Sequence, residues 1–242
     1  MHFVGVDLAW GQRRPTGVAV LDKSGSLVNI AVALDDPSVE SALGPYVEGD
    51  CMVAVDAPLI VTNPTGQRQC EAALNRDFRR FEAGAHPCNT GKPECAATPR
   101  GARLAYNLGL DMDPASTRTR RAVEVYPHPA SVALFHLDRT LKYKQKRGRT
   151  FELLKTELLR LMLLVENLTD ANPAMDVTPN PEWRRMRSAV ESATRKFELR
   201  RVEDPVDAVM CAYIAYYAHH RPDDMTVYGD FATGYIVTPT LG

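Results

Sequence analysis

The sequence lacks the features that mark secreted and membrane-spanning proteins. Its first seven residues contain no Lys or Arg and already reach a carboxylate at Asp7, so we expect no signal peptide. The most apolar helical stretch, from Leu158 to Val165, is interrupted by Arg160 and is far shorter than the roughly 20 residues that cross a bilayer. We therefore expect a cytoplasmic protein with no membrane partner.

Cysteine is scarce, and its pattern matches no known framework. An odd number of scattered cysteines in a chain without secretion signals predicts reduced thiols. His86, Cys88 and Cys95 lie close together, but they do not have the paired C-x₂-C spacing of structural zinc sites. We expect ordinary buried or loop thiols there. The five are Cys51, Cys70, Cys88, Cys95 and Cys211.

Motifs for nucleophilic catalysis and for nucleotide binding are absent as well. The chain has no G-x-S-x-G elbow and no Walker-type glycine loop, so serine hydrolases and P-loop enzymes find no support.

Neither sign of charge is in excess, because 29 Lys and Arg stand against 30 Asp and Glu, for a net charge of −1. The distribution along the chain is nevertheless uneven. Residues 1–60 carry a balance of −5, residues 61–150 a balance of +8 and residues 151–242 a balance of −4. The near-neutral total is a cancellation between a basic middle third and two acidic flanks.

The hydrophobic pattern predicts a mixed α/β fold, and a chain of 242 residues suits one large domain or two small ones. Apolar runs predict strands at 3–10, 16–21, 27–34, 51–56 and 122–126, with a turn at 11–15, and two short strands near 227 and 236. Periodicity predicts helices at 37–47, 69–81, 101–108, from 130, 151–168, 182–200 and 205–219.

Carboxylates follow two of the predicted strands. Asp7 and Asp56 each end an apolar run, and if those strands are parallel neighbours, both side chains emerge at the edge where α/β proteins place ligand sites. The alternative is that each aspartate only caps a strand or starts a turn. Two matching positions favour a site.

Three further acids are candidates for the same site. Glu124 interrupts a buried strand and needs a partner, either a metal ion or an arginine such as Arg68, Arg120 or Arg121. Asp204 precedes Pro205, the arrangement of a helix N-cap, and Asp207 lies on the same helix face. The small residues that continue this face would let the helix approach the sheet closely: Ala208, Cys211, Ala215 and Ala218.

Clustered carboxylates repel one another, and a divalent cation relieves that repulsion. Hard oxygen ligands suit Mg²⁺ or Mn²⁺ better than zinc. Two such ions about 4 Å apart activate water and stabilise the leaving oxygen of a phosphodiester. The acids therefore indicate phosphoryl chemistry.

The order of these motifs resembles the ribonuclease H-like superfamily. The chain is more closely similar to the family called domain of unknown function 429, whose members are described as predicted RNase H-like nucleases. The resemblance covers most of the chain, and its motifs are 4–7 (VGVD), 16–19 (TGVA), 55–59 (VDAPL), 124–128 (EVYPH) and 204–208 (DPVDA).

The resemblance implies a ribonuclease H-like fold: a five-stranded mixed sheet flanked by helices, with three antiparallel strands first and two parallel strands added. It implies a single domain over residues 1–242, with insertions at about 59–121 and 137–202. It implies metal ligands at Asp7, Asp56 and Asp207, assisted by Asp204. Ribonuclease H itself also has a glutamate on its first helix, where this chain offers only Glu40 in no recognisable motif. Glu124 would then be a family-specific catalytic substitute.

A basic segment, residues 139–149, precedes the helix predicted at 151. In a nuclease it would be a lid that tracks phosphates, with Tyr143 offering a stacking contact. The alternative is a solvated loop. The candidate nucleic-acid-binding residues are Lys142, Lys144, Lys146, Arg147 and Arg149.

Three functions agree with these observations. The first is a metal-dependent nuclease acting on DNA or RNA. The second is an actin-like small-molecule phosphotransferase or nucleotide hydrolase, although two full lobes would strain 242 residues. The third is a non-catalytic binding or assembly protein that retains the fold. Nucleic acid and a second copy of the chain are the partners left open.

Overall fold

A computed structural model of the protein describes residues 1–9 and 14–242. Residue 10, the last of the first predicted strand, and residues 11–13 of the predicted turn lie outside the described residues. Among those described, no helix combines the length and the apolar character needed to cross a membrane.

The centre of the molecule is a five-stranded sheet, and its topology confirms the predicted fold class. Its strands are β1 (His2–Asp7), β2 (Thr16–Leu21), β3 (Leu27–Ala33), β4 (Cys51–Val55) and β5 (Arg120–Glu124), in the order β3-β2-β1-β4-β5. Strands β1, β2 and β3 pair antiparallel, whereas β4 and β5 add in parallel beside β1. This is the arrangement of a ribonuclease H-like fold.

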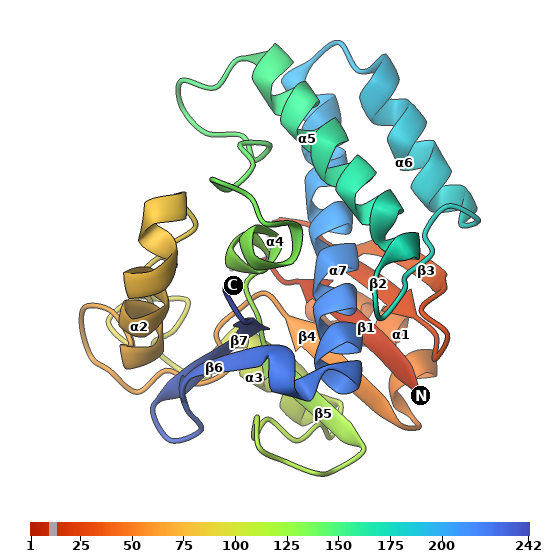
Figure 1. Ribbon diagram of the computed structural model, residues 1–242. Coiled ribbons are helices and arrows are strands. Elements are labelled where there is room, and N and C mark those ends of the chain that lie inside the picture. Colours follow the sequence, from red (N-terminus) through yellow and green to blue (C-terminus); the bar gives the residue numbers. More distant parts are fainter. Residues whose placement is uncertain (10–13) are drawn as a thin grey trace.

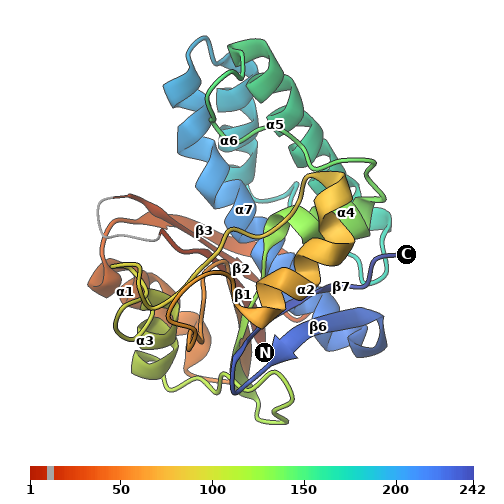
Figure 2. The same ribbon diagram turned by 90° about the vertical axis from the view of Figure 1, so that its left-hand side faces the viewer.

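Seven α-helices surround the sheet in the described residues, and a two-stranded sheet follows at the C-terminal end. The helices are α1 (Asp36–Val47), α2 (Gln69–Phe78), α3 (Arg100–Asn107), α4 (Pro127–Phe135), α5 (Phe151–Glu166), α6 (Pro181–Ser192) and α7 (Lys196–His220). The small sheet pairs β6 (Met225–Asp230) with β7 (Gly234–Pro239). Figures 1 and 2 show α7 running along the large sheet. Helices α5 and α6 lie side by side and pack against the part of α7 that extends beyond the sheet.

Glycines in the sheet let α7 approach closely. A Cβ atom added to Gly5 would overlap the carbonyl oxygen of Ala208, and one added to Gly17 would overlap that of Asp204. Side chains at either strand position would therefore hold the helix away from the sheet. The contact brings the acidic part of α7 to the end of β1.

The boundary between the last two predicted helices was wrong. A break was expected at Pro205, with Asp204 as the N-cap, but α7 starts at Lys196 and continues through the proline. Glu198 accepts hydrogen bonds from the backbone amides of Thr194 and Arg195, and this fixes the earlier start. A proline inside a helix costs about 3 kcal/mol, and here the buried packing of α7 on the sheet offsets that cost.

Candidate carboxylate site

Three of the predicted acids surround one lysine. Asp7 ends β1, whereas Asp204 and Asp207 lie one helical turn apart on α7. The Lys144 Nζ atom lies 3.1 Å from Asp7 Oδ2 and 3.5 Å from Asp204 Oδ1, and it also contacts Asp207 Oδ2. Oxygens from two distant parts of the chain therefore converge on a single cationic atom.

The innermost acid is held by two consecutive residues of the basic segment. Asp207 is 1% exposed, whereas Lys144 is 23% and Asp204 26% exposed. The Tyr143 hydroxyl donates a hydrogen bond of 2.6 Å to Asp207 Oδ1, and Lys144 pairs with the other oxygen. Asp207 is thereby fixed in position at the bottom of the cluster.

Asp56 stands beside this cluster without a partner of its own. It follows β4 directly, and because β4 is parallel to β1, it lies at the same sheet edge as Asp7. Within the described part of the chain, its carboxylate makes no hydrogen bond or ion pair. Burial first, and then the charge of Asp7, raise its pKa well above 3.8.

The cluster carries more negative charge than Lys144 can balance. Burial raises the pKa of Asp7 to about 7, although Lys144 opposes the shift. Burial would lower the pKa of Lys144, but the charges of Asp207 and Asp7 outweigh it and hold that pKa well above the ordinary value. The lysine is therefore charged, and adding a further cation would lower the electrostatic energy of the acids.

The oxygens are arranged around an ammonium and not as a ready-made metal cage. In the described ranges, 1–9 and 14–242, no group of three or more His, Cys, Asp or Glu side chains has a geometry that could hold a metal ion. The donor set itself consists of carboxylate oxygens, which are the ligands that Mg²⁺ and Mn²⁺ prefer. A divalent cation at this cluster would compete with Lys144.

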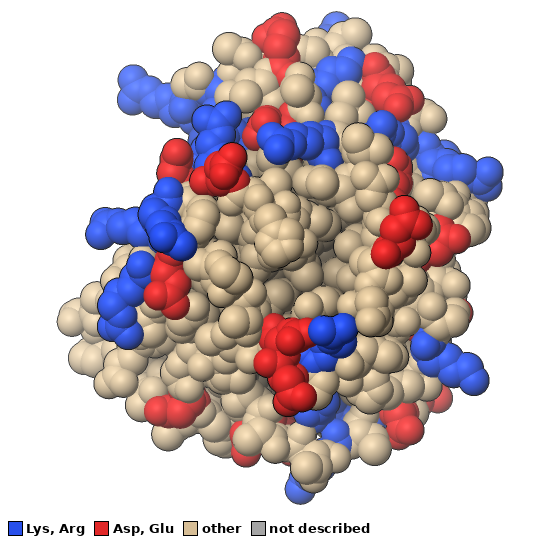
Figure 3. All heavy atoms as spheres, in the orientation of Figure 1, with Lys and Arg blue, Asp and Glu red and all other residues tan. Residues whose placement is uncertain are grey.

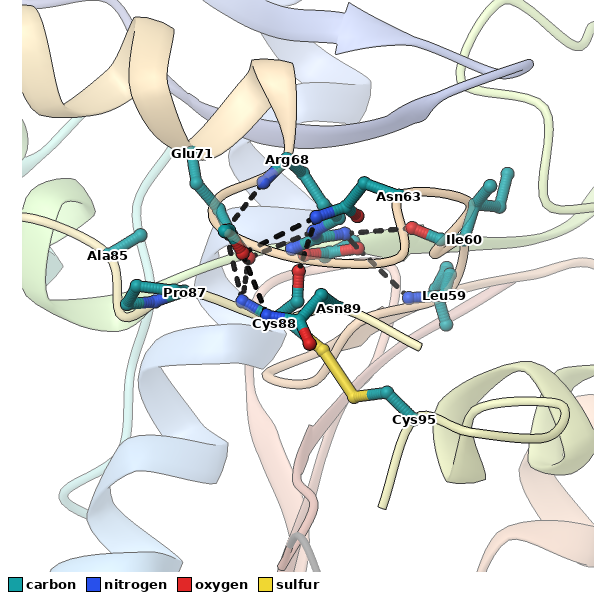
Figure 4. A network of polar contacts seen from close by, with 12 residues as sticks. Leu59, Ile60, Asn63, Arg68, Glu71, Ala85, Pro87, Cys88, Asn89 and Cys95 are labelled. Atoms are coloured by element: carbon teal, nitrogen blue, oxygen red, sulfur yellow. Dashed lines mark hydrogen bonds and ion pairs between the residues drawn. A yellow bond between two sulfur atoms is a disulfide. The ribbon is translucent and has the colours of Figure 1, made fainter. Parts of the chain in front are cut away.

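Glu124 belongs to a separate buried ion network. Its two carboxylate oxygens accept hydrogen bonds of 2.5 and 2.9 Å from Arg68, and the Leu59 amide donates another of 2.9 Å. Arg68 also pairs with Glu71 at 2.9 Å, and Glu71 in turn accepts from the backbone amide of Cys88 (Figure 4). Either a metal ion or an arginine was expected as the partner of Glu124, and in the structure the partner is Arg68.

A cavity of about 170 Å³ separates this network from the carboxylate cluster. Asp56 and Glu124 both line it, together with Arg68, His86 and Tyr126. The cavity therefore gives Asp56 a second, partly polar surface beside Arg68 and Glu124.

The prediction of reduced thiols was wrong for one pair. Cys88 and Cys95 form a disulfide within the loop between α2 and α3 (Figure 4), whereas Cys51, Cys70 and Cys211 are free and buried. The loop folds back on itself over only seven residues, which brings the two sulfur atoms together. Cys88 and Cys95 are consequently not available as metal ligands.

The basic segment divides into inward and outward residues. Lys144 enters the acid cluster, and Lys142 pairs with Glu82 at 2.6 Å. Lys146 and Arg147 are exposed, and Arg149 donates a hydrogen bond of 2.6 Å to the Lys144 carbonyl. The stacking contact expected of Tyr143 is wrong, because its ring is 2% exposed.

Sequence reasoning gave one side chain of the site a different role and missed another. Lys144 was expected to contact phosphate, and nothing in the spacing of the basic run sets it apart from its neighbours. Glu203 is 4% exposed, and burial raises its pKa to about 7. Its position next to Asp204 was the only available signal, since one acid beside another on a charged helix normally indicates an exposed face.

Comparison with known proteins places the chain in a family. The family model described as "Protein of unknown function (DUF429)" matches residues 5–233, which include all the acids of the carboxylate cluster. Searches among curated proteins and among solved structures found no match. The chain belongs to the DUF429 family, whose function is unknown.

Proposed function

We propose that the protein is a divalent-metal-dependent phosphodiesterase that acts on DNA or RNA. The observation that carries the proposal is the convergence of Asp7, Asp204 and Asp207 on one cationic atom. The residues suited to hold Mg²⁺ or Mn²⁺ are these three and the unpaired Asp56. When bound, the metal would activate water and neutralise charge on the phosphate.

Each side chain of the cluster then has a separate task. Asp7 and Asp56 present oxygens from the sheet edge, whereas Asp204 and Asp207 present theirs from α7. Tyr143 orients Asp207 by its hydrogen bond to Oδ1. Lys144 balances part of the negative charge before metal binds and stays close enough to stabilise charge on a phosphate oxygen.

Glu124 enters the proposal as a positioning residue. It is bound to Arg68 on both oxygens, so it has no free oxygen to offer a metal or a water molecule. Its network fixes the loop after β4 through the Leu59 amide, three residues beyond Asp56. Glu124 would thus hold the strand end that carries Asp56.

Strand β4 offers a matched pair of variants for the test. Asp56 directly follows the strand, whereas Asp50 directly precedes it at the opposite end and is exposed. Single-stranded, duplex, hybrid and branched nucleic acids would be incubated with Mg²⁺ or Mn²⁺ and each purified variant. We expect cleavage by the wild type and by Asp50→Asn, and its loss in Asp7→Asn and Asp56→Asn. Equal cleavage by all four proteins would indicate contamination and reject the proposal.

One observation favours the non-catalytic alternative. The ion pairs of Lys144 already neutralise part of the cluster and join residues 139–149 to β1 and α7. A fold-retaining assembly protein needs nothing more. Failure to bind Mn²⁺ at millimolar concentration, with no cleavage of any substrate, would support this function instead.

A further inference from the structure

A second pocket lies directly against the carboxylate cluster, and most of its wall is basic. It has a volume of about 500 Å³, within the range of pockets that bind small molecules. Asp204 and Lys144 line it and also belong to the cluster. The remaining charged lining residues are Arg14, Lys146, Arg147, Lys196, Arg200 and Glu203.

Three separate parts of the chain supply these cations. Arg14 comes from the segment before β2, Lys146 and Arg147 from the basic segment, and Lys196 and Arg200 from the start of α7. The fold, and not one local run of sequence, therefore creates the concentration of positive charge.

Most of these cations have no anionic partner. Among the described residues, Arg14, Lys146, Arg147 and Arg200 form no ion pair and no side-chain hydrogen bond. Burial, and then the charges of Arg149, Lys142 and Lys144, lower the pKa of Lys146. Cations that repel one another without a counter-ion favour binding of an anion.

The loop that carries two of them is fixed in place. The ammonium group of Lys196 donates a hydrogen bond of 2.5 Å to the Arg149 carbonyl, and Arg149 donates to the Lys144 carbonyl. The backbone of residues 144–149 is thereby tied to the start of α7, so the pocket is largely formed before a ligand binds.

One face of α7 runs from positive to negative charge. Lys196, Arg200, Asp204 and Asp207 follow one another at spacings of four, four and three residues, which places them along the same face. A phosphate held by the first two would lie beside a metal ion held by the last two. A phosphate oxygen is a common ligand of Mg²⁺ bound by carboxylates.

A buried oxygen in the pocket also lacks a partner. Glu203 Oε1 has no hydrogen-bond partner among the described residues, although the side chain is almost fully enclosed. An unsatisfied buried oxygen is costly, and a hydroxyl group or a metal-bound water of a ligand in this pocket would satisfy it.

We propose that this pocket binds a phosphate group adjacent to the one that reacts at the carboxylates, and that the ligand is a chain of phosphates. Such a chain is either the backbone of a nucleic acid or a small polyphosphate. The position beside a reacting phosphate rests on the proposed function, whereas the binding of phosphate by this pocket does not. Elsewhere the charges are mixed: on the face seen in Figure 3, Lys and Arg lie beside Asp and Glu around a largely uncharged, hollowed centre.

The test is a binding measurement without metal. A labelled single-stranded oligonucleotide and inorganic tripolyphosphate would be titrated into the full-length protein in EDTA at several salt concentrations. The variant Arg147→Ala/Arg200→Ala removes two unpaired pocket cations. Lys23→Ala/Arg184→Ala removes the same charge at exposed positions outside the pocket and is the matched control.

We expect the pocket variant to bind the oligonucleotide at least tenfold more weakly, while the control binds it like the wild type. The slope of log affinity against log salt concentration should correspond to about two fewer released ions in the pocket variant. Tighter binding of tripolyphosphate than of the oligonucleotide, with the same dependence on Arg147 and Arg200, would identify a small polyphosphate as the ligand. Equal losses in both variants, or no binding at all, would overturn the inference. If the pocket variant cleaves nucleic acid with an unchanged KM, the phosphate-binding role of the pocket is rejected and the proposed function stands. If the wild type binds phosphate chains through Arg147 and Arg200 but cleaves none, the pocket stands and the proposed function is rejected.

Discussion

The ammonium group of Lys144 pairs with the carboxylate of Asp207, a side chain that is almost completely buried. Removing one partner of a buried ion pair leaves the other uncompensated, which typically costs about 3–5 kcal/mol. Since Lys144 is itself 23% exposed, we expect Lys144→Met to lower the free energy of unfolding by about 2 kcal/mol in EDTA. Urea denaturation measures this change.

The same variant should bind a divalent cation more tightly. Lys144 occupies the point on which the carboxylate oxygens converge, so its removal eliminates a competitor of the metal. At about pH 8 we expect Mn²⁺ affinity to increase at least tenfold by calorimetry. Lys142→Met breaks an outer pair with Glu82 in the same segment and should leave Mn²⁺ affinity unchanged. An unchanged affinity in Lys144→Met would show that ammonium and metal do not share this position.

Stability should decrease as pH rises through the range in which Asp7 loses its proton. Burial raises the pKa of this residue from 3.8 to about 7, so the folded protein binds the proton more tightly than the unfolded chain does. Between these values the folded state holds more protons, and the free energy of unfolding must fall with rising pH. Asp7→Asn lacks this dependence. Its unfolding free energy relative to the wild type should therefore increase by roughly 4 kcal/mol between about pH 4 and pH 8.

Urea denaturation of both proteins across this range measures the difference. Asp230→Asn is a control without a raised pKa, because hydrogen bonds from Thr233 lower the pKa of Asp230. That group titrates below the range tested, so its removal should shift stability equally at all these pH values. A difference between Asp7→Asn and wild type that stays constant with pH would contradict the raised pKa.

The arrangement of Asp7, Asp56 and Asp207 could be predicted because it follows from local patterns. An apolar run that ends in an acid gives a strand end, parallel pairing brings two such ends together, and a face of small residues brings a helix against them. Each step depends on residues close together in the sequence. The individual strands were predictable for the same reason, whereas their order and directions in the five-stranded sheet were implied by the resemblance to the ribonuclease H-like superfamily.

The partners of these acids were not predictable in that way. Lys144 reaches Asp207 across 63 positions, and the path of the intervening loop leaves no periodic signal in the sequence. Glu124 needed a partner, but only the fold selects Arg68 from three candidate arginines. Buried ion pairs between distant segments depend on how loops pack, which composition and spacing do not encode.

The buried arginine should be more important for stability than for binding. Arg68 is 2% exposed and pairs with both Glu71 and Glu124, so Arg68→Met leaves two carboxylates buried without a cation. We expect the free energy of unfolding to fall by about 3–5 kcal/mol. Adding Glu124→Gln should restore part of the loss. Arg185→Met removes an exposed pair with Glu182 and should cost less than about 1 kcal/mol. Similar losses in both arginine variants would refute the buried network.

Close contact between β1 and α7 is the structural condition for the whole site, and one methyl group tests it. In Gly5→Ala the new Cβ would overlap the Ala208 carbonyl, so the helix backbone must shift and carry Asp207 away from Asp7. We expect a loss of about 1–3 kcal/mol in unfolding free energy and Mn²⁺ binding weakened at least tenfold. Gly44→Ala makes the same change in α1, where nothing outside its own helix and its chain neighbours lies within 4 Å of the added atom, and should change the free energy of unfolding by less than about 1 kcal/mol. If Gly5→Ala bound Mn²⁺ like the wild type, the acids of the strand and the helix could not form one site.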